Sequence, residues 1–329
     1  FHLPDILELR LGDADAVQGP IFGKGLGGDG DQRLAVVGKL GGAIDGVLVR
    51  ERLFDEALAP LATAHVDRLG APEGSLKLKD ADGNAMPVPH LGPDDFATHT
   101  LALRSALGAF RSDMPELEIV AIGHRIVHGG TAHAEPEKVT DVLMDHLERL
   151  NPFAPLHQPH NLAGVRAAIE AFPGVPNVAC FDTAFHRGHP FVDDTYALPR
   201  HYYEKGVRRY GFHGLSYTYI DGVLAAEEPE LRAGRVVIAH LGSGASLCAV
   251  HNGQSIACTM GFSTLSGLPM GTRAGELDAG VVVYLMDQEK MNAEDITDLL
   301  FRRSGLREGP CEHLLALRLA QARRRAEEE

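Results

Sequence analysis

The chain has 329 residues, of which 44% are hydrophobic and 23% charged, proportions typical of a soluble globular protein. Its length allows roughly two domains with substantial cores. Aspartate and glutamate (45 residues) outnumber lysine and arginine (31 residues), and the resulting net charge of −14 argues against nucleic acid or an anionic membrane as the main partner. The apolar runs are too short to span a bilayer, so we expect no membrane segment.

The chain begins with a glycine-rich, weakly periodic stretch over residues 1–45. It contains GKGLGGDG at residues 23–30 and GKLGG at residues 38–42, and neither has the glycine spacing or the Ser/Thr of a Walker A loop. We therefore predict a flexible or poorly folded segment here and not a phosphate loop.

A strand, helix, strand order follows further along the chain. A helix is expected over residues 96–110 and a buried strand over residues 119–122, within LEIVAIGHRIVHGG. The sequence NLAGVRAAIEAF predicts a helix whose apolar residues share one face. The next buried strand lies in VPNVACFDTAFH and reaches Asp182 at its end. The four residues of the helix face are Leu162, Val165, Ile169 and Phe172.

The second half of the chain predicts more strands and helices. A third strand covers residues 236–241, and Asn252-Gly253 between two alternating runs is a strong hairpin signal. Helices are expected over residues 216–226, 279–287 and 293–303, and the tail from Arg307 onward is typical of a solvated helix or a frayed end. The mixture indicates an α/β architecture with layered sheets.

Four cysteines bear on the compartment. They show no C-x-x-C spacing, and three of them lie in apolar, strand-like runs. This usage predicts reduced thiols in a cytoplasmic protein. The four are Cys180, Cys248, Cys258 and Cys311.

The third strand ends in the smallest residues available. VVIAHLGSGAS, at residues 236–246, passes from an apolar run to glycine, serine and alanine. Small residues let backbone N–H groups approach an oxyanion such as phosphate. A plain tight turn is the alternative.

Several charged and imidazole side chains fit oxyanion chemistry. Arg125 and Arg273 could offer planar donor forks to a carboxylate or phosphoryl group, although each could be an ordinary ion-pairing arginine. Asp182 could be a base, a metal-linked carboxylate or a helix cap. His213 lies directly before a probable helix and His157 lies in a proline-bounded loop, and each could be purely structural. Together with the glycine turn, these groups form the inventory that phosphoryl transfer needs.

Six motifs in a fixed order carry a resemblance. HRIVHGG, APLHQPHNLAGV, FDTAFH, RRYGFHGLSY, HLGSGASLCAV and GFSTLSGLPMGTRAGELDAGVVVYL resemble the acetate and propionate kinase family over about residues 75–306. The resemblance implies the two-domain, ribonuclease H-like α/β fold of the sugar kinase, Hsp70 and actin superfamily, incomplete at both ends. The expected domains are residues 1–182 and 183–329, the second binding nucleotide.

The resemblance also implies an activity. Members of this family transfer the γ-phosphoryl group of ATP to a short-chain carboxylate such as acetate or propionate, with Mg2+, and give an acyl phosphate and ADP. A homodimer is expected by analogy. Acetate, propionate and butyrate are not ranked by this sequence, because one methylene is worth only about 1–3 kcal/mol of discrimination.

Roles for the site residues follow from the resemblance, position by position. It implies that Arg125 and Arg273 hold the carboxylate and the phosphoryl group in transfer, and that Asp182 lies near the acceptor and the metal. His213 would stabilise the transition state, with support from His157; the metal ligands are left unassigned.

The resemblance further implies two binding surfaces. An apolar pocket for the acyl methyl group would be lined by Val127, Leu156 and Phe212. The ATP phosphate loop would consist of His240, Leu241, Gly242, Ser243 and Gly244, with Ser243 in place of the family's usual asparagine.

The sequence departs from the family pattern at both ends. The Asn-x-Gly-Ser-Ser-Ser-x-Lys loop that opens family members is not found before Arg52, where similarity resumes. After RRSGL at residues 302–306, the family's Ser-Asp-x-Arg and Gly-Gly-Ile-Gly-Glu-Asn motifs and its late magnesium-binding glutamate are not found either. We expect altered reading frames or a truncation around a kinase core.

Two other classes of function stay open. One is a catalytically impaired fragment that only binds ligand, favoured by the missing motifs. The other is a metal-dependent hydrolase, suggested by 17 histidines, although no pair belongs to an H-E-x-x-H motif. The closely spaced pairs are His124 with His128, His157 with His160, and His186 with His189.

Overall fold

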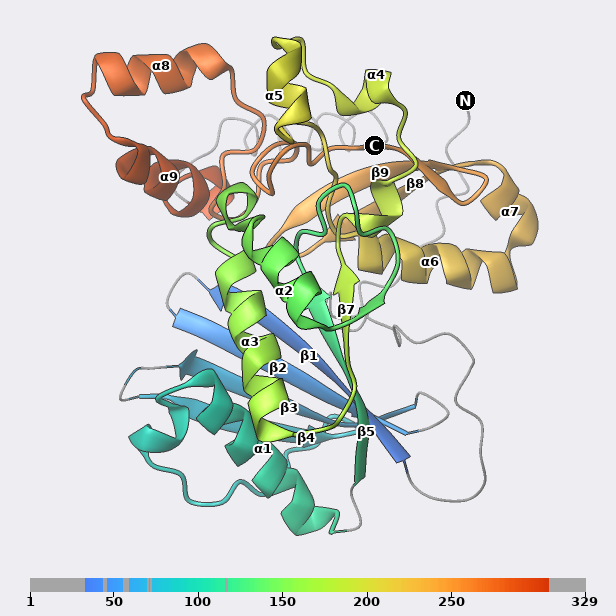
Figure 1. Cartoon of the computed structure of the whole chain (residues 1–329), viewed down its shortest axis with the longest axis vertical. Coiled ribbons are helices and arrows are strands. Elements are labelled where there is room, and N and C mark those ends of the chain that lie inside the picture. Colours follow the sequence, from blue (N-terminus) through green and yellow to red (C-terminus); the bar gives the residue numbers. More distant parts are fainter. Residues whose placement is uncertain are drawn as a thin grey trace, which may run out of the picture.

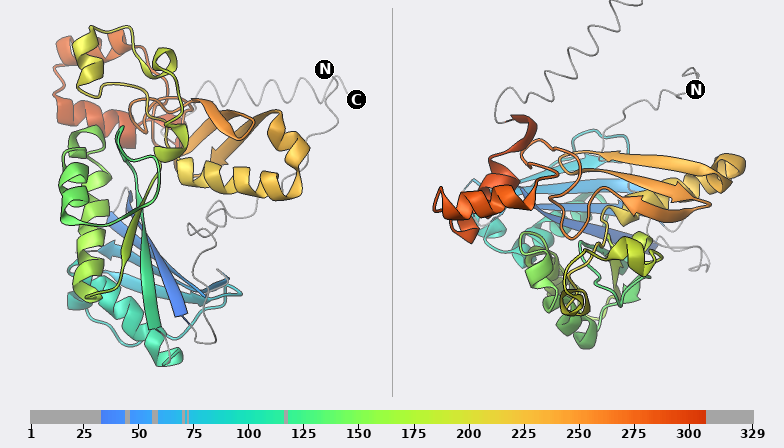
Figure 2. Two further views of the ribbon diagram at one scale, coloured as in Figure 1. Left: turned by 45° about the vertical axis from the view of Figure 1, so that its right-hand side comes forward. Right: turned by 90° about the horizontal axis from the view of Figure 1, so that it is seen from above.

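Two β-sheets organise the chain in the computed structural model, which describes residues 33–307 except 44–45, 56–58, 70, 72 and 116–117. The larger sheet has seven strands in the order β4-β3-β2-β1-β5-β7-β6, and the smaller has three in the order β10-β9-β8. Helices α1 and α3 cover one face of the large sheet, whereas the small sheet lies to one side of it with α6 along its face (Figures 1 and 2). The mixed α/β prediction is therefore confirmed.

The large sheet combines an antiparallel half with a parallel centre. Strands β1 to β4 pair antiparallel in sequence order, while β1, β5 and β7 run parallel, and the short β6 pairs antiparallel with β7. The strands are β1 (Arg33–Ala43), β2 (Gly46–Phe54), β3 (Pro60–Leu69), β4 (Ser75–Asp80), β5 (Glu118–Ile126), β6 (Glu137–Lys138) and β7 (Asn177–Phe181).

The strand β1 overturns part of the expectation for the glycine-rich start. Arg33–Ala43 forms a strand that pairs with β2 on one edge and β5 on the other, so the prediction of a poorly folded segment is wrong there. A central strand is held by backbone hydrogen bonds on both edges, and glycine makes these as well as any residue. The expectation for residues 1–32, and that for the tail at residues 308–329, lie outside the described residues.

The helices on the large sheet are α1 (His99–Asp113), α2 (Asp141–Glu148) and α3 (Gln158–Ala171). The sequence predicted a helix from residue 96, but Pro93–Phe96 is a separate 3-10 turn, η1. Helix α1 begins three residues later because the Thr98 side chain accepts a hydrogen bond from the Leu101 N–H (3.2 Å) and caps the helix.

Helix α3 is the last element of the connection from β5 to β7, after β6, α2 and η2, and it packs against α1 and the sheet. Leu162 and Val165 are buried, as predicted, and Phe172 caps the helix in a buried position. Ile169, predicted to share that face, is 45% exposed, and Ala168 takes the packed position instead. Small side chains on α3 allow the helix to lie close to α1, which rotates the buried face away from Ile169.

The two positions on α3 give a matched stability test. Leu162→Ala should lower the free energy of unfolding by about 2–5 kcal/mol, because it leaves a cavity in a packed core. Ile169→Ala should change it by less than about 1 kcal/mol, because the side chain is exposed. Urea denaturation of both variants measures the difference, and equal losses would show that the face of α3 is assigned wrongly.

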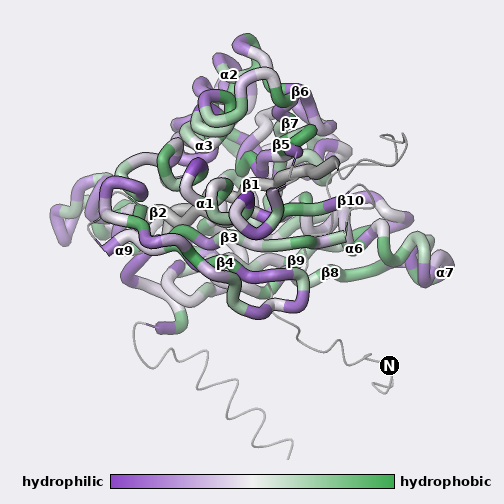
Figure 3. The backbone as a smooth tube through the Cα atoms, turned by 90° about the horizontal axis from the view of Figure 1, so that it is seen from below, coloured by the Kyte–Doolittle hydropathy of each residue, from purple (hydrophilic) through white to green (hydrophobic). Residues whose placement is uncertain are grey.

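The small sheet consists of β8 (Arg235–Leu241), β9 (Ala245–His251) and β10 (Gln254–Cys258). Asn252 and Gly253 both have positive φ, 50° and 72°, which is the geometry of the predicted tight hairpin. Tyr217 on α6 packs on Ile238, Cys248 and Val250 of the sheet. β8 is coloured hydrophobic along much of its length in Figure 3.

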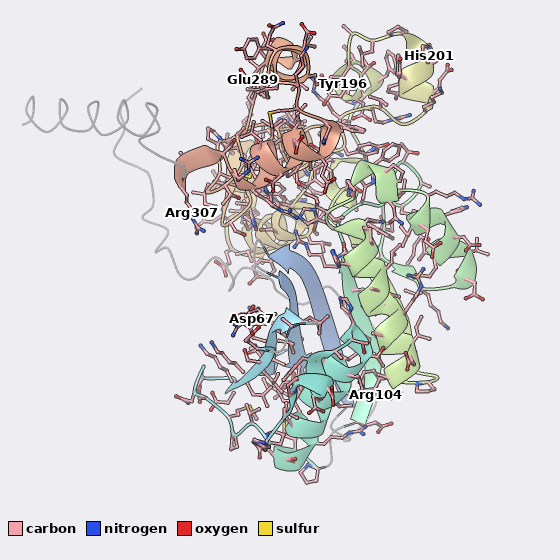
Figure 4. All side chains as sticks on the ribbon, turned by 90° about the vertical axis from the view of Figure 1, so that its left-hand side faces the viewer. Asp67, Arg104, Tyr196, His201, Glu289 and Arg307 are labelled. Carbon is pink, nitrogen blue, oxygen red and sulfur yellow. The ribbon has the colours of Figure 1, made fainter. Side chains whose placement is uncertain are left out.

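The remaining helices confirm three predictions. Helix α6 (Gly214–Glu227), α8 (Ala279–Asp287) and α9 (Ala293–Arg302) match the predicted ranges to within two residues. Short elements complete the described chain: η2 (Asn151–Phe153), η3 (Ala184–His186), α4 (Phe191–Asp194), α5 (Arg200–Glu204), α7 (Pro229–Ala233) and η4 (Gly305–Arg307). In Figure 4, Tyr196 before α5 lies near the upper end of the molecule, whereas Arg104 on α1 lies in its lower half.

The structure bears on three broader expectations, namely the domain boundary, the absence of a membrane segment and the state of the cysteines. The large sheet ends at Phe181 and the small one begins at Arg235, so the sheets fall on either side of the predicted domain boundary, which itself stays a prediction. None of the helices in the described ranges is long and apolar enough to cross a membrane. Cys180, Cys248 and Cys258 are free thiols, and Cys311 lies outside the described residues.

Candidate functional site

The site begins where two parallel strands end. Arg125 is the second-last residue of β5, and Asp182 directly follows β7. The backbone N–H of Asp182 donates a hydrogen bond to the Ile126 carbonyl at the end of β5 (2.9 Å). Because β5 and β7 are parallel neighbours, their carboxyl ends meet at one edge of the sheet. The strand order and the intervening helix thus bring together two residues that are 57 positions apart.

Arg125 and Asp182 form a bidentate ion pair. Arg125 Nε donates to Asp182 Oδ1 and Oδ2 (2.9 and 3.0 Å), and Nη2 donates to Oδ2 (2.5 Å). The Asp182 side chain is 2% exposed and that of Arg125 is 20% exposed. Burial alone would lower the pKa of Arg125, but the Asp182 carboxylate outweighs it and raises the pKa. Both carboxylate oxygens accept from Arg125, which favours an ion pair over a helix cap.

Arg273 adds a second cation from the loop between β10 and α8. Its Nη1 donates to the Thr264 carbonyl (3.0 Å), which fixes the half-buried guanidinium. The loop depends on Gly275, whose φ is +79° and where a Cβ atom would lie 2.6 Å from the Pro269 nitrogen. Burial lowers the pKa of Arg273, and repulsion from the Arg125 charge lowers it further. The two guanidiniums are therefore close enough to interact electrostatically.

His157 lies at the start of α3, next to both arginines. Burial, and then the charges of Arg273 and Arg125, lower its pKa to about 4, so the imidazole is neutral at pH 7. Two guanidinium charges and one carboxylate therefore leave this group of four residues with a net positive charge. Such a region attracts an anion.

His213 enters from the start of α6 in an unusual backbone conformation. Its φ of 61° is left-handed, and a Cβ atom on the next residue, Gly214, would lie 2.3 Å from the Asp182 carbonyl. Gly214 N–H donates to that carbonyl (2.8 Å), so His213 is tied to the end of β7. The imidazole is 8% exposed, and its Nδ1 is 2.8 Å from Ser246 Oγ.

The glycine turn between β8 and β9 lies next to the His213 imidazole and the Arg273 guanidinium. A Cβ atom on Gly244 would lie 3.2 Å from His213 Nε2 and 3.6 Å from Arg273 Nη1. The His240 ring stacks on the His213 ring at 4.0 Å and is bonded through Nδ1 to Ser216 Oγ (3.0 Å). Leu241, Gly242 and Ser243 are exposed. The turn closes a hairpin, and phosphate binding by it stays a prediction.

An apolar cluster lies beside the ion pair. Val127 and Phe212 are buried in it, 6% and 1% exposed, and their role in an acyl pocket stays a prediction. Leu156, which is half-buried next to His157, is not among the described members of this cluster. The place of Leu156 in an acyl pocket stays a prediction. The other buried members are Ala154, Tyr210, Met260 and Met270.

Several polar residues that sequence reasoning missed hold the site in place. Val127 N–H donates to Asn161 Oδ1 (2.9 Å), and His128 N–H donates to Gln158 Oε1 (3.2 Å), both from the first turn of α3. Ser246 Oγ contacts His213 and also the Tyr217 hydroxyl (2.5 Å). The signal in the sequence is weak, namely two amides in the first turn of a helix, because the partners are about 30 residues away.

The paired histidines of the hydrolase hypothesis have other partners. His124 Nε2 is bonded to Asn177 Oδ1 (2.7 Å) inside the protein, and His128 Nδ1 accepts from the Gly130 N–H (2.9 Å). Over the described ranges, no group of three or more His, Cys, Asp or Glu is placed to hold a metal ion.

Fold and site together define an α/β protein with an electropositive, arginine-rich site at the ends of parallel strands, a class suited to binding oxyanions. The family model described as "Acetokinase family" matches residues 49–316, which is more than half of the chain. The chain therefore belongs to the acetokinase family.

Relatives and solved structures agree with this membership. The chain is 51% identical over 264 residues to the acetate kinase of Methylocella silvestris, covering 79% of this chain and 65% of that protein. It is 47% identical to the acetate kinase of Nitrobacter hamburgensis, covering 65% and 53% of the two chains. The chain thus spans less than two thirds of the length of these curated relatives.

The fold matches two crystal structures of the same family. The acetate kinase of Porphyromonas gingivalis has a TM-score of 0.71 and 34% identity, over 83% of this chain and 68% of that one. The propionate kinase of Francisella tularensis has a TM-score of 0.73 and 29% identity, over 83% and 69%. The expected mixed α/β fold is therefore shown for this chain by its likeness to an acetate kinase and a propionate kinase, of which it covers about two thirds.

Proposed function

We propose that this protein transfers the γ-phosphoryl group of ATP to acetate or propionate and releases an acyl phosphate and ADP. The observation that carries the proposal is the convergence of Arg125, Asp182, Arg273 and His213 from four separate elements. Phosphoryl transfer depends on positioning and on stabilising charge around the transferring group, and this arrangement offers both. The relatives named acetate kinase support the same reaction.

The carboxylate is expected to bind at Arg125, whose guanidinium is oriented by Asp182. Its alkyl group then lies toward the apolar cluster of Val127 and Phe212. A carboxylate oxygen attacks the γ-phosphorus, a new P–O bond forms, and the bond to the β-phosphate oxygen breaks as ADP leaves. Arg273 and His213 stabilise the equatorial phosphoryl oxygens, while the backbone of residues 240–244 binds the ATP phosphates.

A divalent cation fits the donor chemistry of the site. Mg2+ prefers oxygen ligands and is commonly held by one or two carboxylates together with substrate phosphates. Asp182 is the one carboxylate among the four convergent residues, and both of its oxygens accept from Arg125, so we propose that it would hold Mg2+ with the nucleotide by sharing an oxygen with that ion pair. When bound, Mg2+ neutralises phosphate charge during transfer.

The direct test is an acyl-hydroxamate assay on the purified chain with ATP and acetate, propionate or butyrate. We expect hydroxamate with acetate and propionate, and loss of the signal when EDTA removes the divalent cation. Restoration by Mg2+ would identify the cation. No hydroxamate from a folded chain with any of the three carboxylates would refute the proposal.

A ligand-binding fragment is the second candidate, because the chain spans only 65% of the length of its Methylocella relative. Isothermal titration calorimetry with ATP separates the two. Binding of ATP without hydroxamate formation would favour the fragment, and hydroxamate formation would exclude it.

Three further expectations remain proposals. A cytoplasmic location fits the three free thiols, of which Cys180 and Cys248 have a pKa raised to about 12 by burial. ATP or ADP and a short-chain carboxylate are the proposed small-molecule partners, and neither nucleic acid nor a membrane is expected as a partner. A homodimer, expected by family analogy, is tested by analytical ultracentrifugation.

The glycine turn gives a prediction on activity. Gly244→Ala should lower kcat by about tenfold, because the added methyl group presses on the His213 ring edge, and small displacements at a reacting centre are costly. Gly222→Ala on α6 is the control, since its Cβ meets nothing within 4 Å. Steady-state kinetics compare them; a Gly244→Ala variant as active as the control would argue against the turn's role.

A further inference from the structure

A buried histidine lies directly behind the site, where no role has been assigned to it. His186 ends η3, four residues after Asp182, and is 0% exposed. Its Nε2 is 3.0 Å from the Phe212 carbonyl oxygen, and its Nδ1 is 2.7 Å from Ser255 Oγ on β10. The ring therefore connects the small sheet to the peptide that joins Phe212 to His213.

The hydrogen-bond partners determine the tautomer of His186. A carbonyl oxygen only accepts, so Nε2 carries the proton and donates to Phe212. Burial lowers the pKa of His186 to about 4, so the ring is neutral and Nδ1 accepts. Ser255 must then donate its single hydroxyl proton to Nδ1. Ser255 Oγ is in turn 2.9 Å from His189 Nε2, which donates to it.

The backbone next to His186 has little freedom. Gly211 has a φ of +73°, and a Cβ atom there would lie 2.5 Å from the His186 ring. His213 has the left-handed φ of 61°, a conformation that residues with a Cβ keep only where their surroundings enforce it. Two hydrogen bonds flank it, from His186 Nε2 to the Phe212 carbonyl and from the Gly214 N–H to the Asp182 carbonyl (2.8 Å).

We propose that His186 is a positioning residue: a neutral imidazole, held as the Nε2–H tautomer by the Phe212 carbonyl and steadied at Nδ1 by Ser255, that fixes the Phe212–His213 peptide and thereby aims the His213 side chain. The geometric claim stands on the structure alone, whereas its consequence for catalysis rests on the proposed function. The same bond also orients Phe212 in the apolar cluster.

The first test is nuclear magnetic resonance of the full chain labelled with 13C,15N-histidine. In the unaltered protein, the 15N shifts should show His186 as the Nε2–H tautomer. His186→Leu removes the donor, and the His213 backbone 13C shifts should move toward ordinary values. His186→Gln keeps an N–H donor and a carbonyl acceptor, so His213 should give signals like those of the unaltered protein.

Controls keep this test decisive. Replacing the exposed His251 by leucine should leave the His213 signals unchanged. If His186→Leu does not fold, Ser255→Ala removes the hydrogen bond at Nδ1 while leaving the ring. The Phe212 carbonyl should keep His186 as the Nε2–H tautomer, and the His213 backbone 13C shifts should move part of the way toward ordinary values. An Nδ1–H tautomer in the unaltered protein, or unchanged His213 signals in His186→Leu, would overturn the inference.

The second test separates positioning from general stability. In an active chain, His186→Leu should lower kcat about a hundredfold, with KM for ATP and acetate within about threefold, while His186→Gln stays within about tenfold of the original kcat. An unchanged kcat in His186→Leu would refute the role in catalysis. Absence of turnover in the unaltered chain would count against the proposed function alone, because the magnetic resonance result decides the positioning.

Discussion

Replacing Arg273 with alanine should lower kcat for acyl phosphate formation by about 10³-fold, the effect typical of losing an arginine that stabilises charge in phosphoryl transfer. The guanidinium is fixed by the Thr264 carbonyl and lies next to the position that a Gly244 Cβ would take, close to His213 Nε2. KM for the carboxylate should change less than kcat, because the interaction strengthens in the transition state. Rates of hydroxamate formation measure both.

Two further variants sharpen the Arg273 result. Arg273→Lys should recover only part of the activity, because an ammonium group cannot reproduce the planar donor fork. Arg302→Ala is the matched control, since Arg302 forms an exposed ion pair with Asp298 on α9. We expect its kcat to stay within about twofold of the original. A loss of less than tenfold in Arg273→Ala would remove Arg273 from the phosphoryl site.

Asp182→Asn should lower the free energy of unfolding by about 3–5 kcal/mol, because it leaves the largely buried Arg125 guanidinium without its counter-charge. The two side chains have nearly the same shape, so the loss reports the charge and not a cavity. Urea denaturation followed by circular dichroism measures it.

An exposed ion pair provides the control for Asp182. Asp298→Asn, whose partner Arg303 is 55% exposed, should cost less than about 1 kcal/mol. If Asp182→Asn cost no more than this control, the bidentate pair would not be a stabilising element of the site. Asp182→Asn should also abolish hydroxamate formation, since Arg125 would lose its orientation.

Local patterns predicted most regular elements well. The alternation around Asn252-Gly253 was sufficient for the hairpin, and the expected ranges of α6, α8 and α9 were close, because such signals depend on neighbouring residues. The strand β1 was missed because its stability comes from two partner strands and not from its own glycine-rich sequence. Ile169 was misplaced because the close contact of α3 with α1 sets which face is buried.

The site was predicted through motifs more than through geometry. Arg125, Asp182, His157 and Arg273 were all named from the sequence, and the structure brings their charges together. The groups that orient them were not predicted, because Ser246 is 33 residues from His213 and Ser255 is 69 residues from His186. The left-handed conformation of His213 has no local signal beyond the glycine that follows it.

The central claim is that these convergent residues carry out phosphoryl transfer in this chain. The most direct measurement is 31P nuclear magnetic resonance of the purified protein with ATP, Mg2+ and 13C-labelled acetate. We expect the γ-phosphate signal to decline while the acetyl phosphate and ADP signals grow in equal amounts, and we expect Arg273→Ala to suppress both changes. A folded protein that leaves the ATP signals intact, or that yields ADP and inorganic phosphate without acetyl phosphate, would contradict it.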